Sequence, residues 1–113
     1  MSKKLDQATS PTCNPWHPMI RPIDLKHLGK LSEEFGEAAA AVSRCIIQGI
    51  DEHEPITHKP NRAWLEDEIA DVLANVALVI DHFKLDLPRI EARVARKKDH
   101  LREWHSMLDD KDD

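Results

Sequence analysis

The chain has 113 residues, 33% charged and 41% hydrophobic, a length that supports one domain and excludes a large multidomain enzyme. Glycine is scarce and tyrosine is absent, which disfavours a β-rich fold. The formal charge of −5 argues against binding to a nucleic acid polymer, whereas it is compatible with an acidic site for divalent cations.

Residues 1–22 are predicted to form a flexible, proline-rich arm, because four of the seven prolines lie there and proline favours extended backbone. Trp16 in this arm either stacks on a base or anchors the arm to the body or a neighbouring subunit. The arm lacks the apolar stretch of a secretory signal, and the chain has no run of 18 apolar residues. A cytoplasmic protein without a membrane partner is therefore expected (host cytoplasm if viral).

Two long helices are predicted over residues 23–48 and 62–83, where apolar residues recur with a period of 3.6 residues. Asp24 and Asn61 are candidate N-caps of the two helices, and Gly49 is expected to end the first. A polar loop with two prolines separates the helices. We expect the two helices to pack antiparallel.

A third helix is predicted with Pro88 in its first turn. Its apolar residues form a heptad seam, in which Trp104 is expected to be core and Lys97 is the one polar position. Residues 109–113 are predicted to be a solvated acidic tail, which leaves 23–108 as the domain. The sequence therefore predicts an all-α helical bundle, completed by self-association as a dimer or a tetramer.

Carboxylates stand beside the apolar stripes of both long helices: Glu33, Glu34 and Glu37 in EEFGE, and Glu68 and Asp71 in EIAD. At about 100° per residue, the acids of each string share one side of their helix, and antiparallel packing brings the two sides together. These charges repel unless a hard cation such as Mg²⁺ or Mn²⁺ neutralises them. The simpler alternative is a solvated acidic face.

The pattern EExxE followed by ExxD resembles the all-α nucleoside triphosphate pyrophosphohydrolases, the MazG-like family. The strings KLSEEFGEAAAAV and LEDEIADVLANVALVI look like the two family motifs, and the resemblance covers about residues 25–101. It implies Mg²⁺-dependent cleavage of a nucleoside triphosphate to a monophosphate and pyrophosphate. The string NPWHPMIRP is similar to short phage-type members that act on dATP and dGTP, some of which support genomes containing 2-aminoadenine. The chain departs from larger members in having one short copy of the motifs.

The resemblance also implies roles for the acids. Glu34, Glu37, Glu68 and Asp71 match the metal ligands of the family. Glu33 matches the leading acid, which binds a further metal or orients the attacking water. Glu33 and Glu37 are therefore the catalytic candidates, because a carboxylate can orient or deprotonate that water.

Basic and amide side chains are the candidates for substrate binding. Lys30 and Lys97 match basic residues of the family that contact phosphates. Lys97 has a second explanation, since a lysine in an apolar seam can extend to the surface. Arg93 lies one turn before Lys97 and can share the phosphate charge. Asn75 lies one turn after Asp71 and can hydrogen-bond a phosphate or sugar, or alternatively another helix.

A non-catalytic helical interaction module is the competing function, with acids that keep its surface soluble. A di-iron bundle is disfavoured, because neither acidic string supplies the histidine of an ExxH pair. His53 and His58 in the loop are a weak signal for a transition metal. The two leading readings differ in one expectation: an enzyme cleft is stabilised by Mg²⁺, and more so with nucleotide present.

Overall fold

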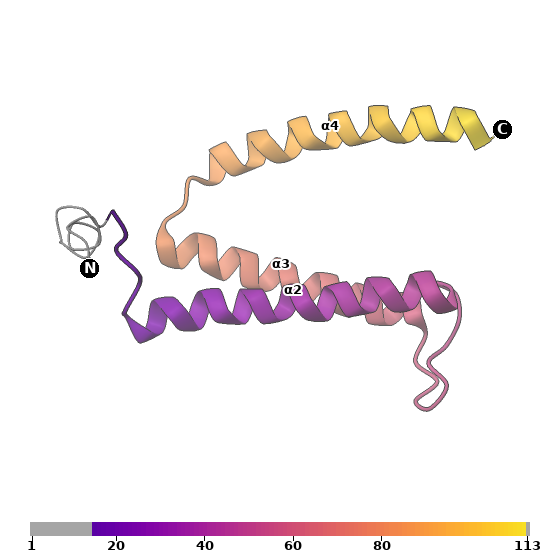
Figure 1. Ribbon diagram of the computed structural model, residues 1–113, viewed down its shortest axis with the longest axis horizontal. Helices are drawn as coiled ribbons and strands as arrows, with labels where there is room; N and C mark the ends of the chain where they lie inside the picture. Colours follow the sequence, from indigo (N-terminus) through magenta and orange to yellow (C-terminus); the bar gives the residue numbers. More distant parts are fainter. Residues whose placement is uncertain (1–14, 113) are drawn as a thin grey trace, which may run out of the picture.

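The computed structural model describes the backbone of residues 15–112 and the side chains of residues 15–108. That part of the chain contains three α-helices and no strand: α2 (Pro22–Gln48), α3 (Asn61–Phe83) and α4 (Leu87–Asp112) (Figure 1). The predicted all-α fold is confirmed. The two long helices begin within one residue of their predicted starts and end where predicted.

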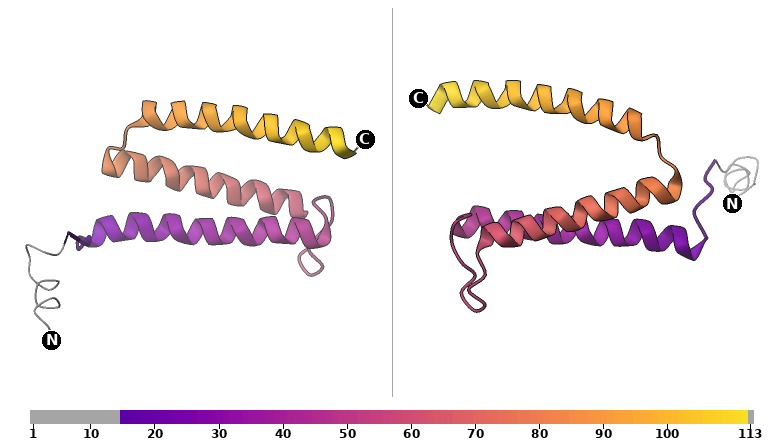
Figure 2. Two further views of the ribbon diagram at one scale, coloured as in Figure 1. Left: turned by 45° about the horizontal axis from the view of Figure 1, so that its top comes forward. Right: turned by 180° about the vertical axis from the view of Figure 1, so that it is seen from behind.

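The helices α2 and α3 pack side by side as an antiparallel pair (Figure 2). The 3.6-residue period turns one stripe of each helix toward the other. Ala41 and Val79 are the buried apolar residues of this interface in the described part of the chain. Two helices share only one interface, so other apolar side chains stay exposed, including Phe35 and Ile46.

Asn61 ties the end of α2 to the start of α3. Its buried side chain donates through Nδ2 to Gln48 Oε1 at 3.1 Å and to Gly49 O at 2.9 Å. The predicted N-cap role of Asn61 is wrong, because Pro60 holds the N-cap position and Asn61 is already helical. Gly49 ends α2 as predicted, with a φ of 105° that suits glycine.

Asp24 links the opposite end of the pair. It does not cap α2, whose N-cap is Arg21 without a side-chain hydrogen bond. Instead, Asp24 Oδ1 lies 2.6 Å from His82 Nε2 near the end of α3. His27 stacks on His82, with ring centroids 4.1 Å apart. Polar contacts therefore fix the register of the pair at both ends.

The helix α4 stands apart from the α2–α3 pair (Figure 2). Pro88 lies in its first turn, as predicted. Every side chain over residues 91–108 is exposed. Trp104 is 54% exposed, so the prediction that it is core is wrong for the single chain. The helix also continues through residues 109–112, which belong to the predicted acidic tail.

The predicted N-terminal arm lies partly outside the described residues, which begin at residue 15. Residues 15–21 are extended and exposed, and they lead away from the start of α2 (Figure 1). The expected packing of the arm on the body or on a neighbouring subunit stays a prediction. None of the described helices has the length and apolarity needed to cross a bilayer.

Candidate metal centre

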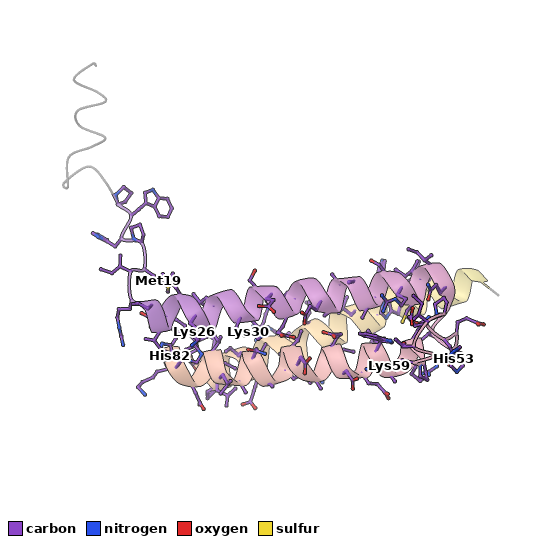
Figure 3. All side chains as sticks on the ribbon, turned by 90° about the horizontal axis from the view of Figure 1, so that it is seen from below. Met19, Lys26, Lys30, His53, Lys59 and His82 are labelled. Carbon is purple, nitrogen blue, oxygen red and sulfur yellow. The ribbon has the colours of Figure 1, made fainter. Side chains whose placement is uncertain are left out.

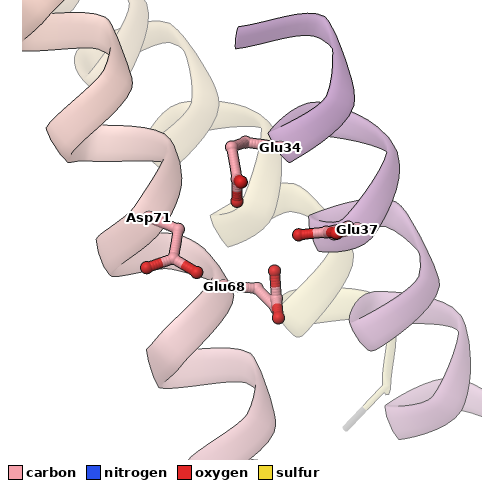
Figure 4. A group of neighbouring side chains, drawn as sticks. All are labelled: Glu34, Glu37, Glu68 and Asp71. Carbon is pink, nitrogen blue, oxygen red and sulfur yellow. The ribbon is translucent and has the colours of Figure 1, made fainter. Parts of the chain in front are cut away.

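The α2–α3 interface gathers four carboxylates at its middle. Glu34 and Glu37 project from α2, while Glu68 and Asp71 project from α3 (Figure 4). One oxygen from each residue lies within 4.8 Å of one oxygen from each of the others. The i, i+3 spacing places each pair on one side of its helix, and the antiparallel packing brings the pairs face to face. These four residues could hold a metal ion, as the sequence predicted.

Two oxygens of this cluster are buried without a hydrogen-bond partner. Glu34 is only 4% exposed, and its Oε2 makes no hydrogen bond within the described residues. Oε2 of Glu68 is buried and unpaired in the same way. Burying an ionised carboxylate oxygen is costly unless a proton, a donor or a cation compensates it. A bound cation would therefore stabilise the cluster by compensating these buried negative charges.

Mutual repulsion also shows in the acidity of Glu37. The neighbouring charge of Glu34 raises the pKa of Glu37, and desolvation and the charges of Glu68 and Glu33 add to that effect. A bound cation reverses such a shift by favouring the ionised form. All ligand atoms are carboxylate oxygens, the donors that hard divalent cations prefer.

Lys30 balances part of this negative charge on the α2 side. Its Nζ lies 3.2 Å from Glu34 Oε1 and 3.3 Å from Glu33 Oε1. Hydrogen bonds to these two carboxylates raise the pKa of Lys30. Glu33 is the one predicted ligand outside the four-residue cluster, and its side chain is 58% exposed. It therefore lies at the rim of the cluster.

Two cavities flank the carboxylates along the groove between α2 and α3. The first, of about 230 Å³, is lined by Glu37, Ala40, Ala41, Arg44, Trp64 and Glu68. The second, of about 290 Å³, is lined by Ile23, Lys26, His27, Lys30, Asn75 and Leu78. We call them the Trp64 pocket and the Lys26 pocket. Because the helices are antiparallel, the order along both is Trp64 pocket, carboxylates, Lys26 pocket.

Trp64 is the functional candidate that the sequence analysis missed. Arg44 lies over its ring, with Cζ 5.1 Å from the centroid, and Lys59 Nζ lies 4.4 Å from the centroid. The indole Nε1 is buried and has no partner among the described residues. The sequence contains a signal for this position, because Trp64 precedes Glu68 by four residues and residues at that spacing lie on the same side of a helix.

The predicted substrate-binding residues separate into two groups. Lys30 and Asn75 line the Lys26 pocket, and Asn75 Nδ2 donates to Asp71 O at 2.8 Å. Arg93 and Lys97 line a hollow on the exposed helix α4, and neither lines the cavities beside the carboxylates. Trp16, 76% exposed on the extended arm, also lines neither cavity. A single chain therefore assembles only part of the predicted set.

The two histidines of the loop are not part of a further metal-ligand cluster within the described part of the chain. Among the described residues, neither His53 nor His58 belongs to a group of three or more potential ligands.

The chain matches no protein-family model, no curated protein and no solved structure. The carboxylate cluster is thus the feature that bears most directly on function.

Proposed function

We propose that this protein is a metal-dependent nucleoside triphosphate pyrophosphohydrolase. The observation that carries the proposal is the cluster of four carboxylates, two of whose oxygens are buried without a partner. An acidic face that is merely solvated has no reason to bury Glu34 or to turn two helices' acids toward each other. The resemblance of EExxE and ExxD to the MazG-like family supports the same activity.

Mg²⁺ is the proposed cofactor, and Mn²⁺ can substitute for it. Both accept oxygen-only ligand sets, and Mg²⁺ keeps positions for water and substrate phosphates. A bound divalent ion lowers the pKa of its water and stabilises charge that develops on the phosphates. Glu34, Glu37, Glu68 and Asp71 would hold it, and the unpaired oxygens on Glu34 and Glu68 fit that requirement.

The catalytic work of the protein follows from the same residues. Glu33, exposed at the rim, or Glu37 orients a water molecule and accepts its proton. The water oxygen forms a new bond to phosphorus at the α–β anhydride, and the bridging P–O bond breaks. The bridging oxygen keeps the electron pair of that bond and leaves with the other half of the anhydride, so the products are a nucleoside monophosphate and pyrophosphate.

The proposed substrates are purine deoxynucleoside triphosphates, dATP and dGTP. The arm string NPWHPMIRP supports this choice through its resemblance to short phage-type members. The Trp64 pocket supports a nucleoside in general, because an aromatic ring and two small alanines border it directly beside the acids. In this proposal the enzyme remodels a viral nucleotide pool for DNA that contains 2-aminoadenine.

Self-association as a dimer or tetramer belongs to the same proposal. Apolar side chains on α4 are exposed in the single chain, including Val94, Leu101 and Trp104. Covering them against a second copy would remove this surface from water. It would also allow Arg93 and Lys97 of one copy to reach phosphates bound by the acids of another.

One incubation tests the activity. The purified protein is mixed with each common NTP and dNTP in Mg²⁺, and the products are separated by ion-exchange chromatography. We expect dAMP and dGMP with equimolar pyrophosphate, and no product from the Glu37→Gln variant. Equal cleavage of dCTP and dTTP would remove the purine assignment and leave the reaction class standing. No cleavage in Mg²⁺ or Mn²⁺ would favour the helical interaction module.

A further inference from the structure

The Lys26 pocket is a basic cavity that adjoins the carboxylates on both helices. Lys30 lies one turn before Glu34 on α2, and Asn75 lies one turn after Asp71 on α3. Both residues also contact members of the carboxylate cluster. Lys30 forms an ion pair with the Glu34 side chain, and Asn75 donates a hydrogen bond to the backbone carbonyl of Asp71. A ligand that reaches from the acids into this pocket therefore meets cations and an amide.

Two lysines line this pocket: Lys30 pairs with Glu33 and Glu34, whereas Lys26 is available for a ligand. Lys26 is exposed and has no ion-pair partner among residues 15–108, and His27 lies half-buried beside it. The nearby carboxylates on α2 are already engaged, because Glu33 and Glu34 pair with Lys30 and Asp24 Oδ1 lies 2.6 Å from His82 Nε2. Figure 3 shows Lys26, Lys30 and His82 together near the start of α2, at the opposite end of the pair from Lys59 and His53.

The start of α2 adds to the attraction for an anion. Its first N–H groups have no side-chain cap, and the helix dipole places partial positive charge at this end. The Trp64 pocket at the other side of the acids is lined by an aromatic ring, two alanines and Arg44, whose guanidinium lies over that ring. The aromatic ring and the alanines suit a nucleoside better than a compact anion. The two cavities are therefore chemically different ends of one groove.

We propose that the Lys26 pocket is the subsite for the terminal diphosphate of the substrate, and hence for the pyrophosphate product. The proposal rests on the proposed pyrophosphohydrolase activity and adds a direction to it. The nucleoside lies toward Trp64, the scissile anhydride lies over the carboxylates, and the β- and γ-phosphates lie against Lys26, His27 and Lys30. Lys26 is the discriminating residue, because it is the one cation of the pocket without an acidic partner in the described chain.

Calorimetric titration separates the two ends of the groove. Full-length protein in Mg²⁺ is titrated with inorganic pyrophosphate and, separately, with dAMP. The variants are Lys26→Gln, which removes the charge, and Lys26→Arg, which keeps it. Arg102→Gln on α4 is the control, because it removes one exposed cation outside the pocket.

We expect Lys26→Gln to weaken pyrophosphate binding about tenfold, the scale of one hydrogen bond to a charged group, and to leave dAMP binding unchanged. Lys26→Arg and Arg102→Gln should bind pyrophosphate like the wild type. A second variant, His27→Gln, should weaken pyrophosphate in the same direction. Circular dichroism verifies that each variant keeps its helices.

Three results would overturn the subsite. The first is that the wild type does not bind pyrophosphate, and the second is that Lys26→Gln binds pyrophosphate as the wild type does. The third is that Lys26→Gln loses dAMP binding and not pyrophosphate binding, which would mean that the substrate lies in the reverse orientation. The incubation with nucleotides is scored separately. If no nucleotide is cleaved but pyrophosphate binds through Lys26, the anion subsite stands and the proposed reaction fails. If nucleotides are cleaved and Lys26→Gln binds pyrophosphate normally, the reaction stands and the subsite fails.

Discussion

The α2–α3 pair and the helix α4 differ in packing and in charge. The pair buries Ala41 and Val79, ties both of its ends with polar contacts and concentrates acids in its groove. Between residues 22 and 83 the chain has twelve acidic and five basic residues, against six acidic and seven basic in the whole of α4, where residues 87–108 hold three of the acids and six of the bases. The helix α4 is therefore exposed and apolar along one seam, and it is positively charged over residues 87–108 but not over its acidic last turn. This contrast is consistent with the proposal that α4 packs against the acidic pair of another copy.

The largest expected effect comes from the carboxylates of the pair. Glu37→Gln or Asp71→Asn should lower turnover by at least about a thousandfold. Each variant removes one charged ligand from the same cluster, Glu37 from the α2 side and Asp71 from the α3 side. The helical circular dichroism signal should persist, and the melting temperature without metal should rise, since repulsion is relieved. Initial rates of pyrophosphate release provide the measurement.

Glu66→Gln is the matched control for that experiment. Glu66 is exposed on α3 and lies outside the four-residue cluster, so the variant should keep wild-type turnover. Wild-type turnover in the Glu37 or Asp71 variant would contradict the cluster's role.

Lys97→Met tests whether α4 contributes to the site of another copy. If Lys97 contacts phosphates there, turnover should fall about 10- to 100-fold, the scale of a lost charge-assisted contact, while the melting temperature stays the same or rises. Arg96→Met is the control from the same helix. A lower melting temperature with unchanged kinetics would instead assign Lys97 to a structural ion pair.

The apolar seam of α4 is expected to hold the copies together. Replacing both Leu101 and Trp104 by Ala should cost at least about 2 kcal/mol of association free energy, about 30-fold in Kd. Sedimentation velocity measures the shift toward monomer as the protein is diluted. Unchanged association would show that α4 is not the interface, and it would contradict the proposed complementarity between α4 and the α2–α3 pair.

Asn61→Ala is expected to destabilise the pair itself without changing its association. The variant removes two hydrogen bonds from a fully buried amide and should cost about 1–3 kcal/mol of unfolding free energy. Arg62→Ala, which breaks an exposed ion pair with Asp51, should cost only about 0–1 kcal/mol. Urea denaturation compares them, and equal losses would remove the special role of Asn61.

The smallest expected effect is the pH dependence that Glu37 causes. Its raised pKa means that the folded state holds the proton more tightly than the unfolded chain does. Without metal, this contribution to stability is present below the ordinary value of 4.5 and is lost as the pH rises through the raised pKa. Melting temperatures from about pH 4 upward should show a shallower decline in Glu37→Gln. Mg²⁺ should offset the decline in the wild type alone.

Local sequence patterns were sufficient to predict the helices and a set of five acids, of which the structure clusters all but Glu33. The 3.6-residue period gave both long helices to within one residue, because helix formation depends on neighbours along the chain. The i, i+3 spacing gave two acids on one side of each helix for the same reason. Capping was predicted less well, since Asp24 and Asn61 make contacts across the pair that no local rule contains.

The amino-acid sequence by itself determined that this chain is helical and that acids flank the apolar stripes of its two long helices. Tertiary structure alone decided that Glu34 is buried, that Trp64 and Lys26 line opposite ends of one groove, and that α4 leaves Arg93 and Lys97 away from it. The reason is that side-chain direction within a helix follows from a fixed rotation per residue. Burial and the meeting of distant residues depend on how whole helices pack against one another.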